Sequence, residues 1–321
     1  MKPTAWALLA CMLVVTQISH AAKDESITLN TPTGELHGSL TLPAGSAPHP
    51  VALLIAGSGP TDRDGNNPAA KNDSLKMVAH ALAEGGIACV RYDKRGIAAS
   101  AAAAKSEADL RFRDLVEDAA AWIRLLAKDP RFTSVSVIGH SEGSTIGMMA
   151  AQDAPVRTYV SIAGPQLNAS AVLRTQLAGK LPPALAQQSE QILVALERGE
   201  RVDAVPPPLL VLYRPSVQPY LIDWFKVHPL EEIKKLRIPV LILQGDTDIQ
   251  IPVSAAQALH VAKPEADLVI VEGMNHVLKL IPNDQARQVA SYSDPSLPVA
   301  PALNEALREF LLAHTGHAAN R

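Results

Sequence analysis

The sequence predicts an α/β fold, in which a mostly parallel central sheet carries helices on both faces. The first observation is a set of short, mainly apolar runs at residues 51–56, 87–92 and 158–163, which suit strands buried on both faces. The second is that helical segments separate these runs, as the crossovers of a parallel sheet require. The third is composition, because a chain of 321 residues with 47% hydrophobic and 19% charged residues can bury a large core.

The first elements are expected to be an antiparallel hairpin followed by alternating strands and helices. Residues 26–29 and 35–42 alternate apolar and polar side chains on either side of the turn sequence Pro32-Thr33-Gly34. The next predicted elements are a strand at 51–56, a helix at 74–84, a strand at 87–92, a helix through 115–126, a strand at 135–138, a helix at 142–152 and a strand at 158–163. Asp129-Pro130 ends the helix through 115–126, because the residue before a proline disfavours helical backbone.

The alternation stops between residues 164 and 236, and this stretch is expected to form an inserted helical lid. It carries a helix-like run at 184–200, the breaker Pro206-Pro207-Pro208 and the four aromatic residues Tyr213, Tyr220, Trp224 and Phe225. Strand signals resume at 238–243 and 267–271 around a helix at 254–262, and a last helix is expected at 304–314. The predicted organisation is a core of residues 23–163 and 237–321, interrupted by a lid of residues 164–236.

Residues 1–22 have the organisation of a secretory signal peptide. Lys2 precedes an apolar stretch at residues 5–18, and the small residues of Ser19-His20-Ala21-Ala22 suit a cleavage site. We therefore expect an exported protein, periplasmic or secreted. The alternatives are a membrane anchor, for which the run is shorter than the ~20 residues that span a bilayer, and lipid attachment at Cys11. Cleavage leaves Cys89 as the single cysteine, in an apolar segment that suits a small buried residue and permits no internal disulfide.

Charge and motif content argue against several classes of partner. The formal net charge of -3 provides no basic stripe for a nucleic acid, and no stable membrane span is expected after signal cleavage. The chain has no H-E-x-x-H motif and no paired cysteines for zinc. Residues 62–66 are acidic, but Gly65 stands at the wrong position for a calcium loop. We expect no metal and no cofactor, and a small-molecule ester or amide as the substrate.

The pentapeptide Gly139-His140-Ser141-Glu142-Gly143 is the strongest chemical signal. It follows the β-branched strand at 135–138 and precedes a helical run, which is the context of a nucleophile elbow. The flanking glycines let strand and helix pass closely, and the sharp turn exposes the Ser141 hydroxyl. A serine hydroxyl needs a base within reach and an acid that orients the base. Asp246 and Asp248 follow one later strand and His276 follows the next, so all lie at the carboxyl edge of the predicted sheet.

With this elbow and the chain order Ser141, Asp248, His276, the protein resembles the α/β-hydrolase superfamily of serine hydrolases. The resemblance covers the chain outside the lid and implies the α/β-hydrolase fold. Within it, the family pattern G-x-x-D matches Gly245 to Asp248, which favours Asp248 as the acid over Asp246. The resemblance implies that His276 deprotonates Ser141 while Asp248 orients the imidazole.

Two further segments carry the resemblance. Residues 55–66 are similar to the oxyanion loop of bacterial exported esterase-like and serine-aminopeptidase-like proteins, which implies that the backbone N–H groups of Ser58 and Glu142 form the oxyanion hole. The family's Asp-x-Arg-Gly pattern matches Asp93 to Gly96, with Ala98 standing where many members have glycine. The charged residues 91–95 are expected to form a solvated loop with internal ion pairs.

The predicted function is hydrolysis of carboxylic esters through an acyl-enzyme. The alternative on the same fold is an aminopeptidase or amidase, which would read a substrate amine with acidic lid residues such as Glu190, Glu197, Glu200 and Asp203. A non-catalytic binding protein is the alternative from another class, and the complete Ser141, Asp248 and His276 set argues against it. His140 is expected to pack near the nucleophile, and His228 in the lid is a further candidate for substrate contact.

Overall fold

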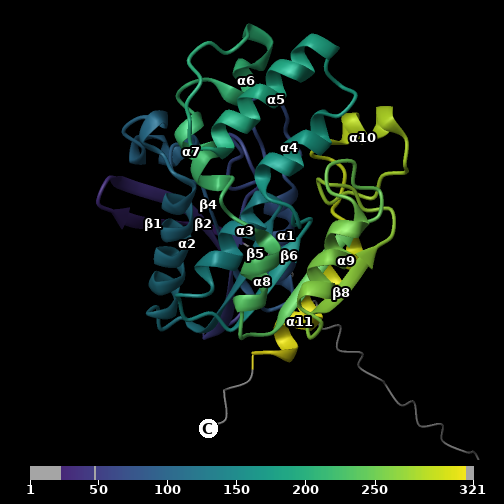
Figure 1. Cartoon of the computed structure of the whole chain (residues 1–321). Coiled ribbons are helices and arrows are strands. Elements are labelled where there is room, and N and C mark those ends of the chain that lie inside the picture. Colours follow the sequence, from purple (N-terminus) through teal and green to yellow (C-terminus); the bar gives the residue numbers. More distant parts are fainter. Residues whose placement is uncertain (1–22, 47, 316–321) are drawn as a thin grey trace, which may run out of the picture.

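The computed structural model describes residues 23–46 and 48–315, and an eight-stranded sheet forms its centre (Figure 1). The predicted signal peptide lies outside the described residues. The strand order is β1-β2-β4-β3-β5-β6-β7-β8. Their bounds are β1 Lys23–Thr31, β2 Gly34–Leu42, β3 His49–Ile55, β4 Ala88–Tyr92, β5 Phe132–His140, β6 Thr158–Ile162, β7 Val240–Gly245 and β8 Asp267–Val271.

Strand directions confirm the predicted mostly parallel sheet. β1 and β2 form the antiparallel hairpin expected from the alternating pattern, and β2 also pairs antiparallel with β4. The other neighbours, from β4 through β3 and β5 to β8, are all parallel. The carboxyl ends of the parallel strands therefore meet at one edge of the sheet, where open α/β folds place their sites.

Two hydrophobic cores lie on opposite faces of the sheet. Successive side chains of a strand point to opposite faces, and in β3 Val51 and Leu53 enter one core while Ala52 and Leu54 enter the other. Because both faces are covered, β4 buries Cys89 completely as a small apolar residue. The continuous apolar runs of the sequence are explained by this double burial.

Helices cover both faces. Helices α1 (Ser74–Glu84) and α11 (Pro301–Ala313) pack against each other on one face. The other face carries α2 (Phe112–Ala127), α3 (Glu142–Ala150), α8 (Pro229–Lys235) and α9 (Val253–Ala262), which pack side by side in the order α2, α3, α8, α9 (Figure 1). The apolar residues recurring at helical spacing in α2 face the sheet, with Trp122 fully buried against Tyr92 of β4.

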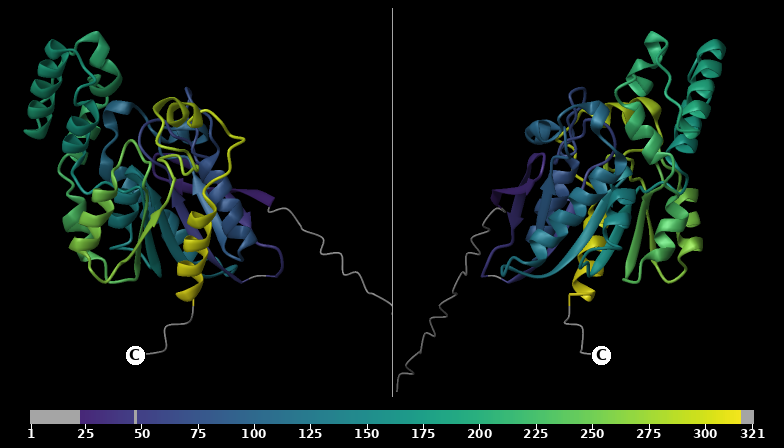
Figure 2. Two further views of the ribbon diagram at one scale, coloured as in Figure 1. Left: turned by 90° about the vertical axis from the view of Figure 1, so that its right-hand side faces the viewer. Right: turned by 60° about the vertical axis from the view of Figure 1, so that its left-hand side comes forward.

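The chain between β6 and β7 contributes further helices beyond the carboxyl edge of the sheet (Figures 1 and 2). These are α4 (Ala169–Leu177), α5 (Pro183–Glu197), α6 (Leu210–Tyr213) and α7 (Gln218–Trp224), followed by α8 back on the face of the sheet. Trp224 of α7 stacks on Phe112 of α2, with ring centroids 5.6 Å apart, which attaches this segment to the core. The lid boundaries at 164 and 236 stay a prediction.

The remaining described helices are short. α10 (Gln285–Ser291) lies near the carboxyl edge, and 3-10 turns occur at Ala98–Ala103, Glu107–Asp109 and Pro207–Leu209. Ala98 adopts a positive φ of 43°, a conformation that favours glycine, so an alanine is strained at this position. Within residues 23–46 and 48–315, no helix has the length and apolar character needed to cross a bilayer.

Candidate active site

Ser141 occupies a sharp turn between β5 and α3. Its φ of 54° and ψ of -121° lie in a region that non-glycine residues rarely adopt, as the elbow motif predicts. The flanking glycines are required by close backbone contacts: a Cβ on Gly139 would lie 2.2 Å from the Gly143 carbonyl oxygen. A Cβ on Gly143 would lie 2.2 Å from the carbonyl oxygen of Ile55 at the end of β3. The strained turn is therefore held by tight packing of α3 on two strands.

The structure brings His276 and Asp248 together. His276 Nδ1 lies 2.8 Å from Asp248 Oδ2, and both side chains are buried. Asp248 also accepts hydrogen bonds from the backbone N–H groups of Gln250 and Ile251 and from the Gln244 side chain. Burial raises the pKa of Asp248, but the charge and hydrogen bond of His276 and the two backbone N–H donors outweigh it, so the pKa lies below 3.8. Asp248 is therefore an anion at neutral pH.

Asp246, the alternative acid, has another partner. Its carboxylate accepts a hydrogen bond from the backbone N–H of Gly273 at 2.6 Å, which ties the loop after β7 to the loop after β8. Asp248 is thus the carboxylate that contacts His276. The interaction of His276 through Nδ1 makes Nε2 the ring nitrogen that can accept a proton from a nucleophile.

The His140 side chain contacts the backbone of His276. The His140 Nε2 atom lies 2.8 Å from the backbone oxygen of His276, and the two rings are 4.9 Å apart. Burial, followed by the neighbouring His276, lowers the pKa of His140 to about 3. His140 is therefore neutral at physiological pH, and its Nε2–H donates to the His276 carbonyl. The predicted proximity to the nucleophile is confirmed.

Ser58 and Glu142, predicted as oxyanion donors, lie at the ends of β3 and β5 respectively. The preceding residue, Gly57, lies close to Ser141, since a Cβ on Gly57 would be 3.2 Å from the Ser141 Cβ. Glu142 is the first residue of α3, and its carboxylate is buried rather than exposed. This carboxylate accepts hydrogen bonds from Lys94 Nζ and from the Tyr220 hydroxyl.

The expected solvated loop at residues 91–95 is wrong. Arg91 and Asp93 are each 1% exposed and Lys94 is 3% exposed, because β4 is an inner strand and the loop after β3 contacts it through Arg63 and Asp64. The partners of these residues come from distant segments rather than from within the loop. Arg91 binds Asp24 and Asp64, Asp93 binds Arg63, Lys94 binds Glu142, and Arg95 binds Asp118.

A cavity of about 220 Å³ contains the reactive groups. Ser141 and His276 line it together with Ser58, and so do polar side chains from the loops that surround it. These polar side chains are Thr61, Asn67, Asn72, Ser74, His140, Gln250 and Tyr292. His228 and the four acidic lid residues proposed as amine receptors are not among its lining residues.

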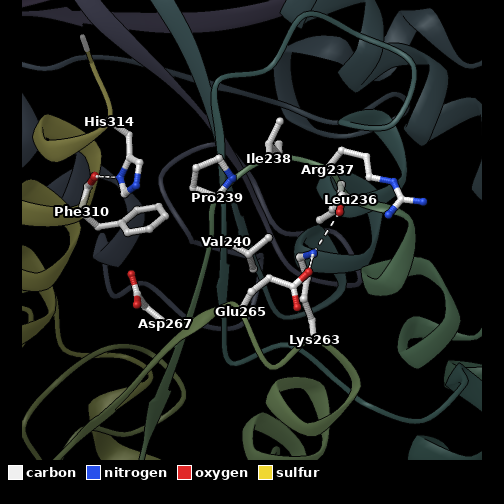
Figure 3. A pocket seen from close by; sticks show the side chains of 10 residues that line it. All are labelled: Leu236, Arg237, Ile238, Pro239, Val240, Lys263, Glu265, Asp267, Phe310 and His314. Carbon is white, nitrogen blue, oxygen red and sulfur yellow. Dashed lines mark hydrogen bonds and ion pairs between the residues drawn. The ribbon is translucent and has the colours of Figure 1, made fainter. Parts of the chain in front are cut away.

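A larger hollow of about 540 Å³ lies at the opposite edge of the sheet, by the amino ends of β7 and β8 (Figure 3). Three of its polar side chains have neighbouring partners: Lys263 donates to the Leu236 carbonyl and to Glu265, and His314 Nδ1 contacts the Phe310 carbonyl. Among the described residues, no serine or cysteine lines this hollow, so it has no nucleophilic hydroxyl or thiol of the kind found at the elbow.

No set of residues in the described part of the chain fits a metal ion, since no group of three or more His, Cys, Asp or Glu side chains there has a suitable arrangement. The acidic residues 62–66 after β3 instead form a turn that is held by hydrogen bonds among nearby residues. Asp62 accepts from the backbone N–H groups of Asp64 and Asn66, while Asn66 donates to Asp73.

Comparison with known proteins gives a family and a fold. A family model described as serine aminopeptidase, S33, matches residues 72–280. Esterase EstD from Thermotoga maritima is 30% identical over 229 residues, which are 71% of this chain and 53% of EstD. The chain therefore spans about half the length of that relative.

Two solved structures share the architecture at low sequence identity. Est1E from Butyrivibrio proteoclasticus superposes with a TM-score of 0.61 at 19% identity, covering 90% of this chain and 98% of Est1E. GrgF, an α/β hydrolase from Penicillium sp. sh18, gives a TM-score of 0.60 at 20% identity, covering 91% and 99% of the two chains. Together with the match of the family model over well over half of the chain, the eight-stranded sheet and the serine elbow show that the chain belongs to the serine aminopeptidase S33 family of α/β-hydrolases.

Proposed function

We propose that the protein hydrolyses carboxylic esters, with Ser141 as nucleophile, His276 as general base and Asp248 as the acid that orients the base. The observation that carries the proposal is that a serine on a strained elbow shares one cavity with a histidine bonded to a buried carboxylate. This combination activates a serine hydroxyl that would otherwise be a poor nucleophile at neutral pH.

The reaction runs in two halves. His276 Nε2 takes the proton of the Ser141 hydroxyl as its oxygen attacks the ester carbonyl carbon, and the carbonyl oxygen becomes an anion. The N–H groups of Ser58 and Glu142 stabilise this oxyanion. When the intermediate collapses, the bond to the alcohol oxygen breaks, and His276 returns the proton to the leaving alcohol. Water, deprotonated by His276, then attacks the acyl-enzyme by the same route and releases the acid.

Both a relative of the chain and the surroundings of Ser141 favour an ester over a peptide as the substrate. EstD, the relative at 30% identity, is named an esterase. In the inserted segment, Glu190 and Glu197 are both engaged by Arg174 in charged hydrogen bonds. No aspartate or glutamate lines the cavity among the described residues, so no carboxylate there is available to pair with a charged substrate amine.

The size and lining of the cavity also favour compact substrates. A space of about 220 Å³ lined by hydroxyl and amide groups suits short or polar acyl chains better than long alkyl chains. We further propose that residues 164–236 act as a lid over this cavity, and that residues 1–22 direct export to the periplasm or outside the cell. Fractionation of cells expressing the full chain would test export.

The decisive experiment pairs labelling with turnover. A fluorophosphonate should modify Ser141, and p-nitrophenyl esters of short acids should be hydrolysed faster than aminoacyl-p-nitroanilides. Ser141→Ala should abolish both reactions, whereas Ser58→Ala, in the same cavity, should retain activity within a few-fold because it keeps its backbone N–H. An unlabelled Ser141 in folded protein, or preference for the anilides, would contradict ester hydrolysis.

A further inference from the structure

A buried lysine joins the two segments that form the proposed oxyanion hole. Lys94 lies just after β4, in the loop expected to be solvated, and is 3% exposed. Its Nζ donates one hydrogen bond to the backbone carbonyl of Gly57 and another, of 2.7 Å, to Glu142 Oε2. Neither contact takes part in the chemistry proposed above. Burying a lysine and a glutamate together is costly unless further hydrogen bonds satisfy both charged groups.

The bond to Gly57 acts on the peptide that carries the first oxyanion donor. The carbonyl of Gly57 and the N–H of Ser58 belong to the same peptide unit, which is planar and rigid. In a trans peptide these two groups point in opposite directions. A donor that fixes the carbonyl therefore fixes the direction of the N–H as well, and it also polarises the N–H towards a stronger hydrogen bond.

The bond to Glu142 acts on the second donor. The backbone N–H of Glu142 is the other predicted oxyanion donor, while its side chain is the one that holds Lys94. Lys94 thus connects the loop after β3 with the first residue of α3 through two hydrogen bonds. The distance between the two oxyanion donors depends on this connection.

A residue of the inserted segment completes the arrangement. Tyr220 of α7 donates its hydroxyl hydrogen bond to Glu142 Oε1, the carboxylate oxygen that Lys94 does not use. Burial, and then the Glu142 charge, hold the pKa of Tyr220 well above 10, so the phenol keeps its proton. Its ring packs against both Phe112 and Trp224, with centroid distances of 6.0 and 5.8 Å, which restrains the hydroxyl.

We propose that Lys94, Glu142 and Tyr220 form a positioning cluster that sets the geometry of the oxyanion hole and makes it depend on the placement of α7. The inference rests on the proposed function, because it assigns these side chains to the same hole. Lys94 and Tyr220 are positioning residues and touch no substrate. If α7 moves away, Glu142 loses one of its two partners, and the peptide held by Lys94 is less firmly oriented.

Two substitutions test the cluster in the full-length enzyme. Lys94→Met removes the donor while keeping an unbranched side chain, and Tyr220→Phe removes a single hydroxyl. Tyr213→Phe is the matched control, because Tyr213 is a buried phenol of the same inserted segment whose hydroxyl contacts Ser189 rather than the site. The measurements are KM and kcat for p-nitrophenyl acetate, the Ki of a trifluoromethyl ketone that forms an oxyanion adduct with serine, and the folded fraction.

We expect Lys94→Met to lower kcat/KM by about 100-fold to 1,000-fold, the effect of losing one oxyanion donor, with KM changed by less than about threefold. The Ki of the ketone should rise by the same factor, which a merely structural role would not produce. Tyr220→Phe should lower kcat/KM about tenfold, as expected for one hydrogen bond to a charged group, and Tyr213→Phe should match the wild type.

Several results would overturn the proposal. Folded Lys94→Met with wild-type kcat/KM and Ki would do so, as would a loss of thermal stability alone. If Lys94→Met does not fold, equal activities of Tyr220→Phe and Tyr213→Phe would overturn it. The wild type and Ser141→Ala tell the two proposals apart. If the wild type hydrolyses esters, Ser141→Ala does not, and the cluster variants keep full activity, then only this inference fails. A wild type without ester turnover or Ser141 labelling contradicts both.

Discussion

Replacing Gly143 by alanine should displace the nucleophile without touching any reacting group. A Cβ at this position would lie 2.2 Å from the Ile55 carbonyl oxygen and 2.7 Å from that of Ala56, whereas ordinary contact begins at 3.4 Å. Both atoms belong to the backbone, so no side-chain rotation relieves the overlap. The start of α3 must therefore retreat from the end of β3 by about 1 Å.

The size of the effect follows from that displacement. Ser141 and the Glu142 N–H move with α3, while Ser58 stays with the loop after β3. A misplacement of about 1 Å is worth about 100-fold in rate when reacting groups must be aligned. Overpacking of this kind also lowers the free energy of unfolding by about 1–3 kcal/mol. We expect Gly143→Ala to fold with a lower Tm and to lose at least about 99% of kcat/KM for p-nitrophenyl acetate.

Gly85→Ala is the control for this substitution. Gly85 ends α1, and a Cβ there would lie 2.9 Å from Cδ of Arg308, an exposed side chain that can move aside. Its kcat/KM should equal that of the wild type. If soluble, folded Gly143→Ala kept activity within about threefold of the wild type, the tight elbow would not be what places Ser141.

Three further perturbations test other parts of the molecule. Asp248→Asn should lower kcat about 10⁴-fold in the same ester assay, whereas Asp246→Asn should have only a small effect. Burial raises the pKa of Asp24, but its hydrogen bonds with Arg91 outweigh burial, so the pKa lies below 3.8. Asp24→Asn should therefore lower the free energy of unfolding by about 2 kcal/mol at neutral pH. Chemical denaturation should show the difference shrinking as pH falls below about 4, because the Asp24 carboxylate of the unfolded wild-type chain gains a proton there while that of the folded protein stays ionised. Burial raises the pKa of the Cys89 thiol to about 12, so iodoacetamide at pH 8 should label it only after unfolding, and rapid labelling of native protein would refute this.

Local patterns in the sequence were sufficient to predict most of the helices and strands. The helix predicted at 74–84 has the observed bounds of α1, and the strand predicted at 267–271 has those of β8. α1 has apolar residues at helical spacing that face the core, whereas β8 is a short, continuous apolar run after Asp267. α7 and α10 were missed because each has only seven residues, too few for a period to show, and α7 has a proline at its start.

The site was only partly predictable for a different reason. Ser141, Asp248 and His276 each belong to a short motif at a strand end, so their approach follows from the topology of a parallel sheet. Lys94 pairs with Glu142 across 48 residues, and no local pattern distinguishes a buried lysine from a solvated one. The bond from Gln244 to Asp248 was missed as well, since an amide inside an apolar strand gives no signal of its partner.

The contact between His140 and the backbone of His276 spans 136 residues of chain, and the loops after β3 and β7 complete the same cavity. No contiguous stretch of the sequence therefore contains the site, and contacts of such long range are expected to form late in folding. Recovery of esterase activity after dilution from denaturant would then report the final step of assembly, lagging behind the regain of helical circular dichroism. Cleavage anywhere between the elbow and the last strand should abolish activity unless both pieces stay associated.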